Sequence, residues 1–173
     1  MGMNQQHLFD EDETTRFTKH TPFNGPRDQN IATPRALICA LESHLDVRFG
    51  LDAAAVKSTA VCANYLGPDH VTEHRRDAFK VDSWQPSMWA DWVWLNPPFD
   101  DIKRWYLEAL KRICLDLDAP GCVMLLPART SMDWFHLAED NRSVDVWFPR
   151  GRIDFKNTGK SPYEHTVVLV IRQ

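Results

Sequence analysis

The sequence lacks the features that would assign it to the membrane or to the secretory pathway. No apolar run approaches the ~20 residues that a membrane-spanning helix needs. Residues 1–16 are polar and acidic, which excludes the apolar core of a secretory signal. We therefore expect a cytoplasmic protein with no membrane partner.

Clustered metal ligands are also missing. The four cysteines, at positions 39, 62, 114 and 122, lie far apart and form no C-x-x-C pair. Zinc sites need ligands that are grouped in the sequence or the fold. We therefore predict no metal, and we expect the cysteines to be reduced.

The chain has no overall positive charge, since its formal net charge is −4. The charge is uneven, however, because residues 147–163 hold four basic side chains and only one acidic side chain, Asp154. A local basic patch can bind phosphate on a molecule of opposite net sign. We predict DNA contacts for Arg150, Arg152 and Lys156, with an ordinary solvated loop as the alternative. Arg129, which follows a predicted strand, is a further DNA candidate or a helix-capping ion pair.

The order of the predicted elements indicates an α/β protein. Residues 1–28 have no hydrophobic period and predict a disordered or loosely attached acidic tail, which leaves a domain over residues 29–173. In that domain strands alternate with helices, which favours a sheet with helices on both faces. The predicted strands are 49–51, 92–95, 122–126, 144–148 and 166–171, and the predicted helices are 33–45, 58–65, 100–113 and 131–138.

The segment Asn96-Pro97-Pro98-Phe99 ends a predicted buried strand. Two prolines cannot continue a central strand, so the chain leaves the sheet there, at the edge where α/β proteins bind ligands. The prolines remove two N–H donors while their carbonyls can still accept hydrogen bonds, and the Asn96 side chain adds another acceptor. Phe99 supplies a flat apolar face. These groups suit an amine attached to a planar ring.

Methylation of such an amine needs this kind of pocket. The lone pair of an aromatic amine is delocalised into the ring, so the nitrogen is a poor nucleophile. Two acceptors that bind its N–H groups favour a pyramidal nitrogen and stabilise the positive charge that develops during transfer. Stacking on a ring orients the base for in-line attack. The segment therefore predicts a transferase that needs neither a strong base nor a covalent nucleophile.

The segment resembles the Asp/Asn/Ser-Pro-Pro-aromatic signature of amino-methyltransferases. Residues 30–171 as a whole resemble the phage-type DNA N6-adenine methyltransferases, the Dam-like family. The pieces that carry this resemblance are residues 32–34, 51–54, 93–99, 123–136 and 148–153, in the order that the family has. The resemblance implies a minimal Rossmann-like S-adenosylmethionine-dependent methyltransferase sheet with flanking helices. It also implies methyl transfer to adenine N6 in DNA, a phage or prophage origin and the host cytoplasm.

The resemblance also implies roles for single residues. Thr33 and Pro34 match an element on the cofactor side, while Asp52 and Ala53 match the acidic end of the first strand. Asp77 matches a polar contact to the cofactor's adenine, and the residues from Asn96 to Phe99 match the holder of the target amine. Most relatives carry a G-x-G turn after the first strand, where this chain has alanines. Only 44 positions separate Asp52 from Asn96, so we expect a helix there to be short or missing.

Two other functions share these features. The same signature serves methylation of protein glutamine, and RNA adenine is a related substrate. A chain that kept the fold and lost the cofactor would be a DNA-binding module without activity, and the missing G-x-G turn favours that alternative. The sequence predicts neither the oligomeric state nor the target site.

Overall fold

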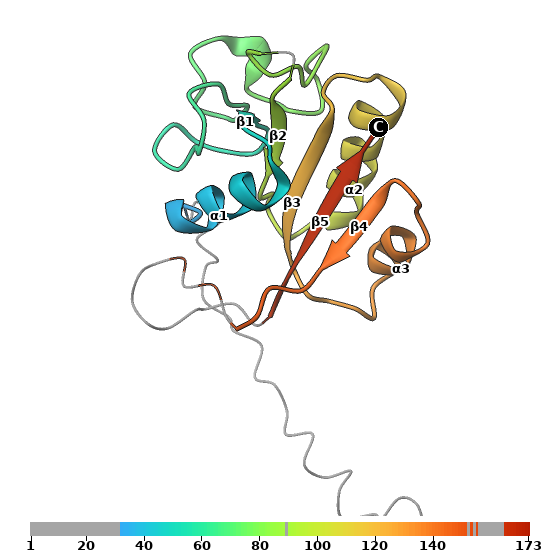
Figure 1. Ribbon diagram of the computed structural model, residues 1–173. Helices are drawn as coiled ribbons and strands as arrows, with labels where there is room; N and C mark the ends of the chain where they lie inside the picture. Colours follow the sequence, from blue (N-terminus) through green and yellow to red (C-terminus); the bar gives the residue numbers. More distant parts are fainter. Residues whose placement is uncertain (1–31, 89, 152, 154, 156–164) are drawn as a thin grey trace, which may run out of the picture.

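The computed structural model describes residues 32–88, 90–151, 153, 155 and 165–173. These residues form a mixed α/β structure (Figure 1). The predicted tail, 1–28, lies outside the described residues, so its boundary at residue 29 stays a prediction. Arg152 and Lys156 also lie outside them.

Five strands form one sheet in the order β1-β2-β3-β5-β4. The strands are β1 Phe49–Asp52, β2 Trp92–Leu95, β3 Gly121–Pro127, β4 Val144–Trp147 and β5 Thr166–Arg172, which confirms the five predicted strands. β1, β2 and β3 run parallel, and β5 runs antiparallel to both β3 and β4. The carboxyl ends of β1, β2, β3 and β4 therefore meet at one edge of the sheet.

Helices cover both faces of the sheet, as predicted (Figure 1). α1 Arg35–Leu45 packs Ile38 and Leu41 on the face that carries Trp94, Val123 and Val168. α2 Ile102–Leu110 and α3 Asp133–Glu139 pack on the opposite face. Successive residues of β3 alternate between the two clusters, as the period of two in a strand requires. The two apolar clusters therefore lie on either side of one buried sheet.

Two local predictions differ from the structure. The helix predicted over residues 58–65 is absent, because the backbone there bonds to the end of β1 instead: the Asp52 N–H donates to the Asn64 carbonyl at 3.0 Å. The helix predicted over residues 33–45 begins at Arg35, and no side chain caps it. The expectation of a short or missing helix between Asp52 and Asn96 is confirmed, since the described part of residues 53–91 contains only a 3-10 turn, Glu73–Arg75.

Candidate functional site

A pocket of about 350 Å³ opens at the carboxyl ends of β1 and β2. Its walls come from the residues after β1, from two stretches of the long β1–β2 connection, from the residues after β2 and from α2. The lining residues are Thr33, Asp52, Ala53, Ala54, Ala55, Val56, Thr59, Leu66, Gly67, Pro68, Arg76, Asp77, Ala78, Phe79, Trp94, Asn96, Pro98 and Trp105. Sequence positions more than 70 residues apart thus meet in one site.

The structure brings together most of the predicted methyl-transfer residues. Thr33, Asp52 and Ala53 line the pocket with Asp77, and so do Asn96 and Pro98. Pro34, Pro97 and Phe99 do not line it. Pro97 is buried, and Phe99 packs against the apolar cluster on the α2 face. Stacking of a base on Phe99 therefore stays a prediction.

Asp52 is a buried carboxyl group at the end of β1, with 3% of the residue exposed. Its two oxygens accept hydrogen bonds from the backbone N–H groups of Val61, at 3.0 Å, and Ala54, at 3.3 Å. Burial raises the pKa of Asp52 from 3.8 to about 6, and the two hydrogen bonds only partly oppose that rise. At neutral pH the Asp52 side chain is therefore mostly an ionised, buried carboxylate. Such a group favours a cationic partner.

Small residues on two segments line the pocket beside the end of β1. The backbone of Ala53 to Ala55 runs beside residues 64–66, with the Ala55 N–H donating to the Leu66 carbonyl at 3.0 Å. A Cβ on Gly67 would lie 1.6 Å from the Ala55 carbonyl oxygen. Gly67 therefore allows a close approach of two backbone segments that a side chain would prevent. No sequence pattern had indicated a role for Gly67.

Asn96 stands at the point where β2 leaves the sheet, and its side chain is half-buried. Its Nδ2 donates a hydrogen bond to Oγ1 of Thr33 at 3.2 Å. Among the residues that the structure describes, Oδ1 of Asn96 has no hydrogen-bond partner. Oδ1 can therefore accept a hydrogen bond, and the predicted role of Asn96 as a holder of the target amine stays a prediction.

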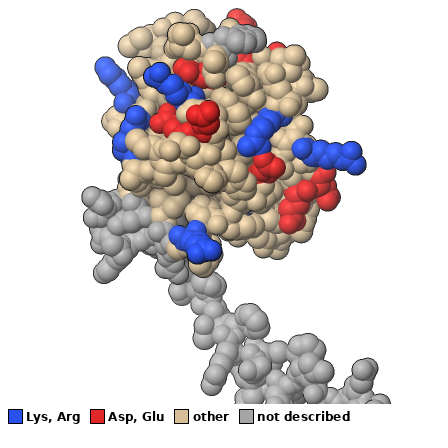
Figure 2. All heavy atoms as spheres, viewed as in Figure 1, with Lys and Arg blue, Asp and Glu red and all other residues tan. Residues whose placement is uncertain are grey.

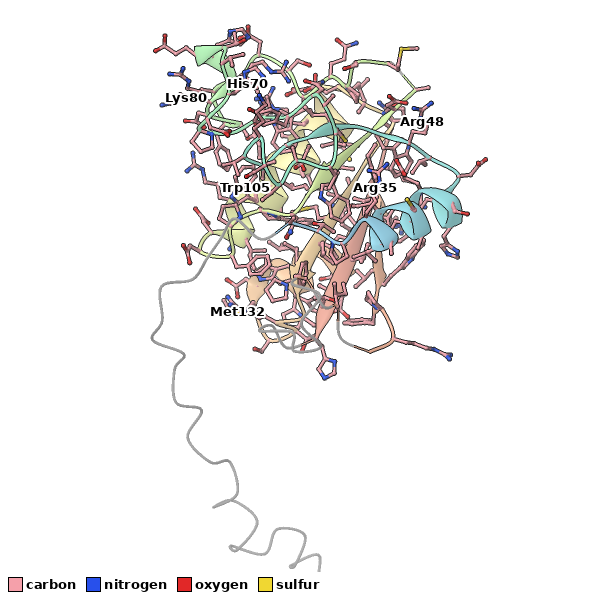
Figure 3. The ribbon with its side chains drawn as sticks, turned by 90° about the vertical axis from the view of Figure 1, so that its left-hand side faces the viewer. Arg35, Arg48, His70, Lys80, Trp105 and Met132 are labelled. Atoms are coloured by element: carbon pink, nitrogen blue, oxygen red, sulfur yellow. The ribbon has the colours of Figure 1, made fainter. Side chains whose placement is uncertain are left out.

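Two aromatic side chains line the part of the pocket that the β1–β2 connection and α2 form. The rings of Phe79 and Trp105 lie 4.4 Å apart, and the guanidinium of Arg104 lies 3.8 Å from the centre of the Phe79 ring. Figure 3 shows Trp105 on α2, beneath the connection that carries His70 and Lys80. The sequence had assigned Trp105 only to the apolar face of a helix and had not indicated Phe79. Their pairing depends on a contact between distant segments, which no local pattern reveals.

Asp77 lies next to this aromatic pair, where it closes a turn. Its Oδ1 accepts a hydrogen bond from the Phe79 N–H at 3.0 Å, and its Oδ2 lies 3.3 Å from Nζ of Lys80. The carboxylate is thus held in the pocket wall while remaining partly open to solvent. This position is compatible with the predicted polar contact to a nucleoside.

A buried arginine in η3, the π-helical segment Lys111–Leu115 that continues α2, holds the β1–β2 connection in place. Arg112, with 3% of the residue exposed, donates to the carbonyls of Val81 and Asp82 at 2.8 Å each. Its Nε pairs with Glu108 at 2.7 Å. Nearby, the backbone N–H of Trp84 donates to Asp118, and the Trp84 indole donates to the Ala78 carbonyl at 2.9 Å. These bonds set the position of residues 76–84, one wall of the pocket.

The two described DNA candidates stand at the same edge of the sheet as the pocket. Arg129 follows β3 and Arg150 follows β4, and both are exposed. Phe148, 56% exposed, contacts Phe135 of α3 at a ring distance of 6.1 Å. Figure 2 shows charged side chains of both signs in small groups over a largely uncharged face. The face drawn there carries no continuous basic patch among the described residues.

Two features are absent from the described part of the chain. No group of three or more His, Cys, Asp or Glu side chains in it could hold a metal ion. No helix in it is long and apolar enough to cross a membrane.

Comparison with known proteins matches this chain to a family. The family model described as "DNA N-6-adenine-methyltransferase (Dam)" matches residues 20–167. A DNA N-6-adenine-methyltransferase of Escherichia phage T1 is 28% identical over 118 residues, which are 67% of this chain and 43% of that relative. The chain thus matches less than half the length of this curated relative.

Proposed function

The chain belongs to the Dam family, and we propose that it transfers a methyl group from S-adenosylmethionine to N6 of adenine in DNA. The observation that carries this proposal is that one pocket holds both a buried carboxylate, Asp52, and a proline-locked amide, Asn96. The two groups have opposite tasks, since one attracts a cation and the other accepts hydrogen bonds from an amine. We also propose that the sheet is a minimal Rossmann-like one, because its ligand pocket lies at the carboxyl ends of parallel strands.

The lining of the pocket fits S-adenosylmethionine. Its volume of about 350 Å³ lies within the usual range for ligand pockets. Asp52 suits the ammonium group of the methionine part, and the alanines beside it leave room for a chain to pass. Asp77 and the Phe79–Trp105 pair suit the polar edge and the face of an adenine ring. When bound, the cofactor supplies an activated methyl group on a sulfonium.

Asn96 and the prolines would hold the acceptor. Oδ1 of Asn96 and a backbone carbonyl of the proline pair are acceptors that can bind the two N–H groups of adenine N6. These bonds favour a pyramidal nitrogen whose lone pair points at the methyl group. They also stabilise the charge that develops on the nitrogen, which is electrostatic catalysis. The proton leaves after transfer, so no strong base is needed in the pocket.

DNA would approach the carboxyl edge of the sheet. A base inside a duplex cannot reach Asn96, which is half-buried, so the target adenine has to leave the stack. Arg129 and Arg150 stand at this edge to contact phosphates, and we place Arg152 and Lys156 with them from the sequence alone. Such an enzyme would work in the cytoplasm of the host cell if it is phage-encoded.

Labelled methyl transfer tests this proposal. The full chain is incubated with methyl-labelled S-adenosylmethionine and DNA, RNA or protein, and each product is digested to nucleosides or amino acids. We expect label in N6-methyladenine from DNA. Label in glutamine or in RNA adenine would instead establish one of the related transferases. Absence of both transfer and cofactor binding in calorimetry would establish a DNA-binding module without activity.

Asn96→Ala separates the assigned role from the fold. We expect this variant to lose at least about a thousandfold in the rate of methyl transfer, because one acceptor of the developing charge is removed. Cofactor affinity and melting temperature should change little. Asn141→Ala, in the turn after α3, is the matched control and should keep full activity. Undiminished transfer by Asn96→Ala would refute the role of Asn96.

A further inference from the structure

Thr33 and Asn96 are 63 positions apart and are joined by one hydrogen bond across the pocket. Thr33 is 9% exposed, and it precedes α1 without capping it. The first turn of the helix is closed by the Pro34 carbonyl, which accepts from the Leu37 N–H at 3.0 Å. The hydroxyl of Thr33 is therefore used by Asn96 and not by the helix that follows it.

This bond matters because an asparagine amide has two unlike ends. Oδ1 accepts hydrogen bonds and Nδ2 donates them, and a rotation of about 180° exchanges their positions. An amide turned the wrong way would point N–H groups at the N–H groups of the target amine. In the structure Nδ2 donates to Oγ1 of Thr33, which holds the amide at the pocket wall and leaves Oδ1 available to accept from the target amine.

We propose that Thr33 is a positioning residue that orients the Asn96 amide for amine methylation. This inference rests on the proposed function and adds a residue to it. It assigns Thr33 a role in the chemical step, whereas the sequence placed this residue among the cofactor contacts. Thr33 itself touches neither reacting atom, and it acts through Asn96.

The two roles for Thr33 give opposite kinetic results. Thr33→Val keeps the shape of the side chain and removes the hydroxyl, while Thr33→Ser keeps the hydroxyl. We expect Thr33→Val to lower kcat about five- to tenfold, which corresponds to the loss of one hydrogen bond. Cofactor affinity, measured by calorimetry on the full chain, should change less than twofold, and Thr33→Ser should restore most of kcat.

A second background tests whether Thr33 acts through Asn96. Asn96→Ala removes the amide, so the Thr33 hydroxyl has no side chain at position 96 to hold. We expect Thr33→Val to have less than a twofold effect on the residual kcat in the Asn96→Ala background, against five- to tenfold in the wild type. Equal effects in both backgrounds would show that the hydroxyl acts without the amide, and would overturn the inference.

The remaining outcomes also decide the question. Weaker cofactor binding by Thr33→Val with unchanged kcat would return Thr33 to the cofactor contacts. A lower melting temperature with activity lost equally in both backgrounds would show a structural role, and either result overturns the inference. If the wild type transfers no methyl group, the proposed function fails first. If it does and Thr33→Val is as active as the wild type, only the role of Thr33 fails.

Discussion

Between β1 and β2 the described chain runs through residues 53–91 with a single 3-10 turn, whereas β3, β5 and β4 pair along nearly their whole lengths. The paired half of the sheet is held by backbone ladders and by side chains that alternate between two apolar clusters. The irregular half is held by side chains that bond to the backbone of distant segments, such as Asp52 to Val61 and Arg112 to Val81. Most of the pocket lies in the irregular half.

This difference explains the shape of the site. A regular strand can present only every second side chain to one face. The connection after β1 instead brings Gly67, Asp77 and Phe79 to one pocket from two separate turns. The few buried polar bonds that hold this connection should therefore contribute more to ligand binding than its apolar contacts do.

The largest expected effect comes from breaking the anchor of the irregular half. Arg112→Met should lower the free energy of unfolding by about 3 kcal/mol, because Glu108 loses its buried partner and two carbonyls lose their donors. Denaturant titration measures this loss. The variant should also bind S-adenosylmethionine more weakly, since residues 76–84 line or support the pocket.

Lys111→Met is the matched control for that variant. Lys111 is exposed and pairs with Asp116 at 3.2 Å, a surface ion pair that contributes at most about 1 kcal/mol. If both substitutions have equally small effects, the buried arginine does not hold the connection, and the contrast between the two halves is lost.

A smaller effect, dependent on pH, is expected at Asp52. Its pKa is raised by burial to about 6, so the folded protein keeps a proton that the unfolded chain releases near pH 3.8. The contribution of Asp52 to stability therefore falls as the pH rises from 3.8 to about 6, and it is constant above that. Relative to Asp52→Asn, the wild type should lose about 2 kcal/mol of unfolding free energy between pH 4 and pH 7.

Cofactor binding should show the opposite trend with pH. A cation binds to the ionised carboxylate, so wild-type affinity should fall up to about tenfold per pH unit below pH 6. Asp52→Asn should bind more weakly at pH 7, and its affinity should lack that transition. An affinity that is flat from pH 5 to pH 7 in the wild type would mean that Asp52 does not face a cation in the complex.

The regular half had been largely predictable from the sequence. The apolar runs 122–126 and 166–171 have the length of buried strands, and Asp101, which accepts from the Arg104 N–H at 3.3 Å, marks the start of α2. The irregular half was not predictable, because its contacts join residues far apart in the chain. Residues 58–65 contain enough apolar positions to suggest a helix, and only their bonds to the end of β1 show why none forms.

The site was predictable in part for the same reason. Asn96 and Pro98 follow a strand, so a local pattern located them at a sheet edge. Asp52 came from the resemblance to a family, and its burial could not be predicted. The Gly67 approach and the Phe79–Trp105 pair depend on tertiary contacts and left no signal in the sequence.

The smallest expected effect concerns the exposed arginines of the carboxyl edge. Arg150→Gln should weaken DNA binding several-fold at moderate salt, without changing cofactor affinity. The slope of log affinity for DNA against log salt concentration should fall by about the amount that one phosphate contact contributes. Arg142→Gln, an exposed arginine before β4, is the control, because it stands at the opposite end of that strand. Equal losses for both variants would indicate a diffuse charge effect and no defined edge for DNA.

Hydrogen–deuterium exchange with and without S-adenosylhomocysteine tests the central claim most directly. The account predicts added protection in peptides that cover residues 52–56, 64–68 and 76–79, with little change in β5, β4 and α3. Protection confined to the paired half, or to the outer face of α2, would place the ligand elsewhere and contradict the assignment of the pocket.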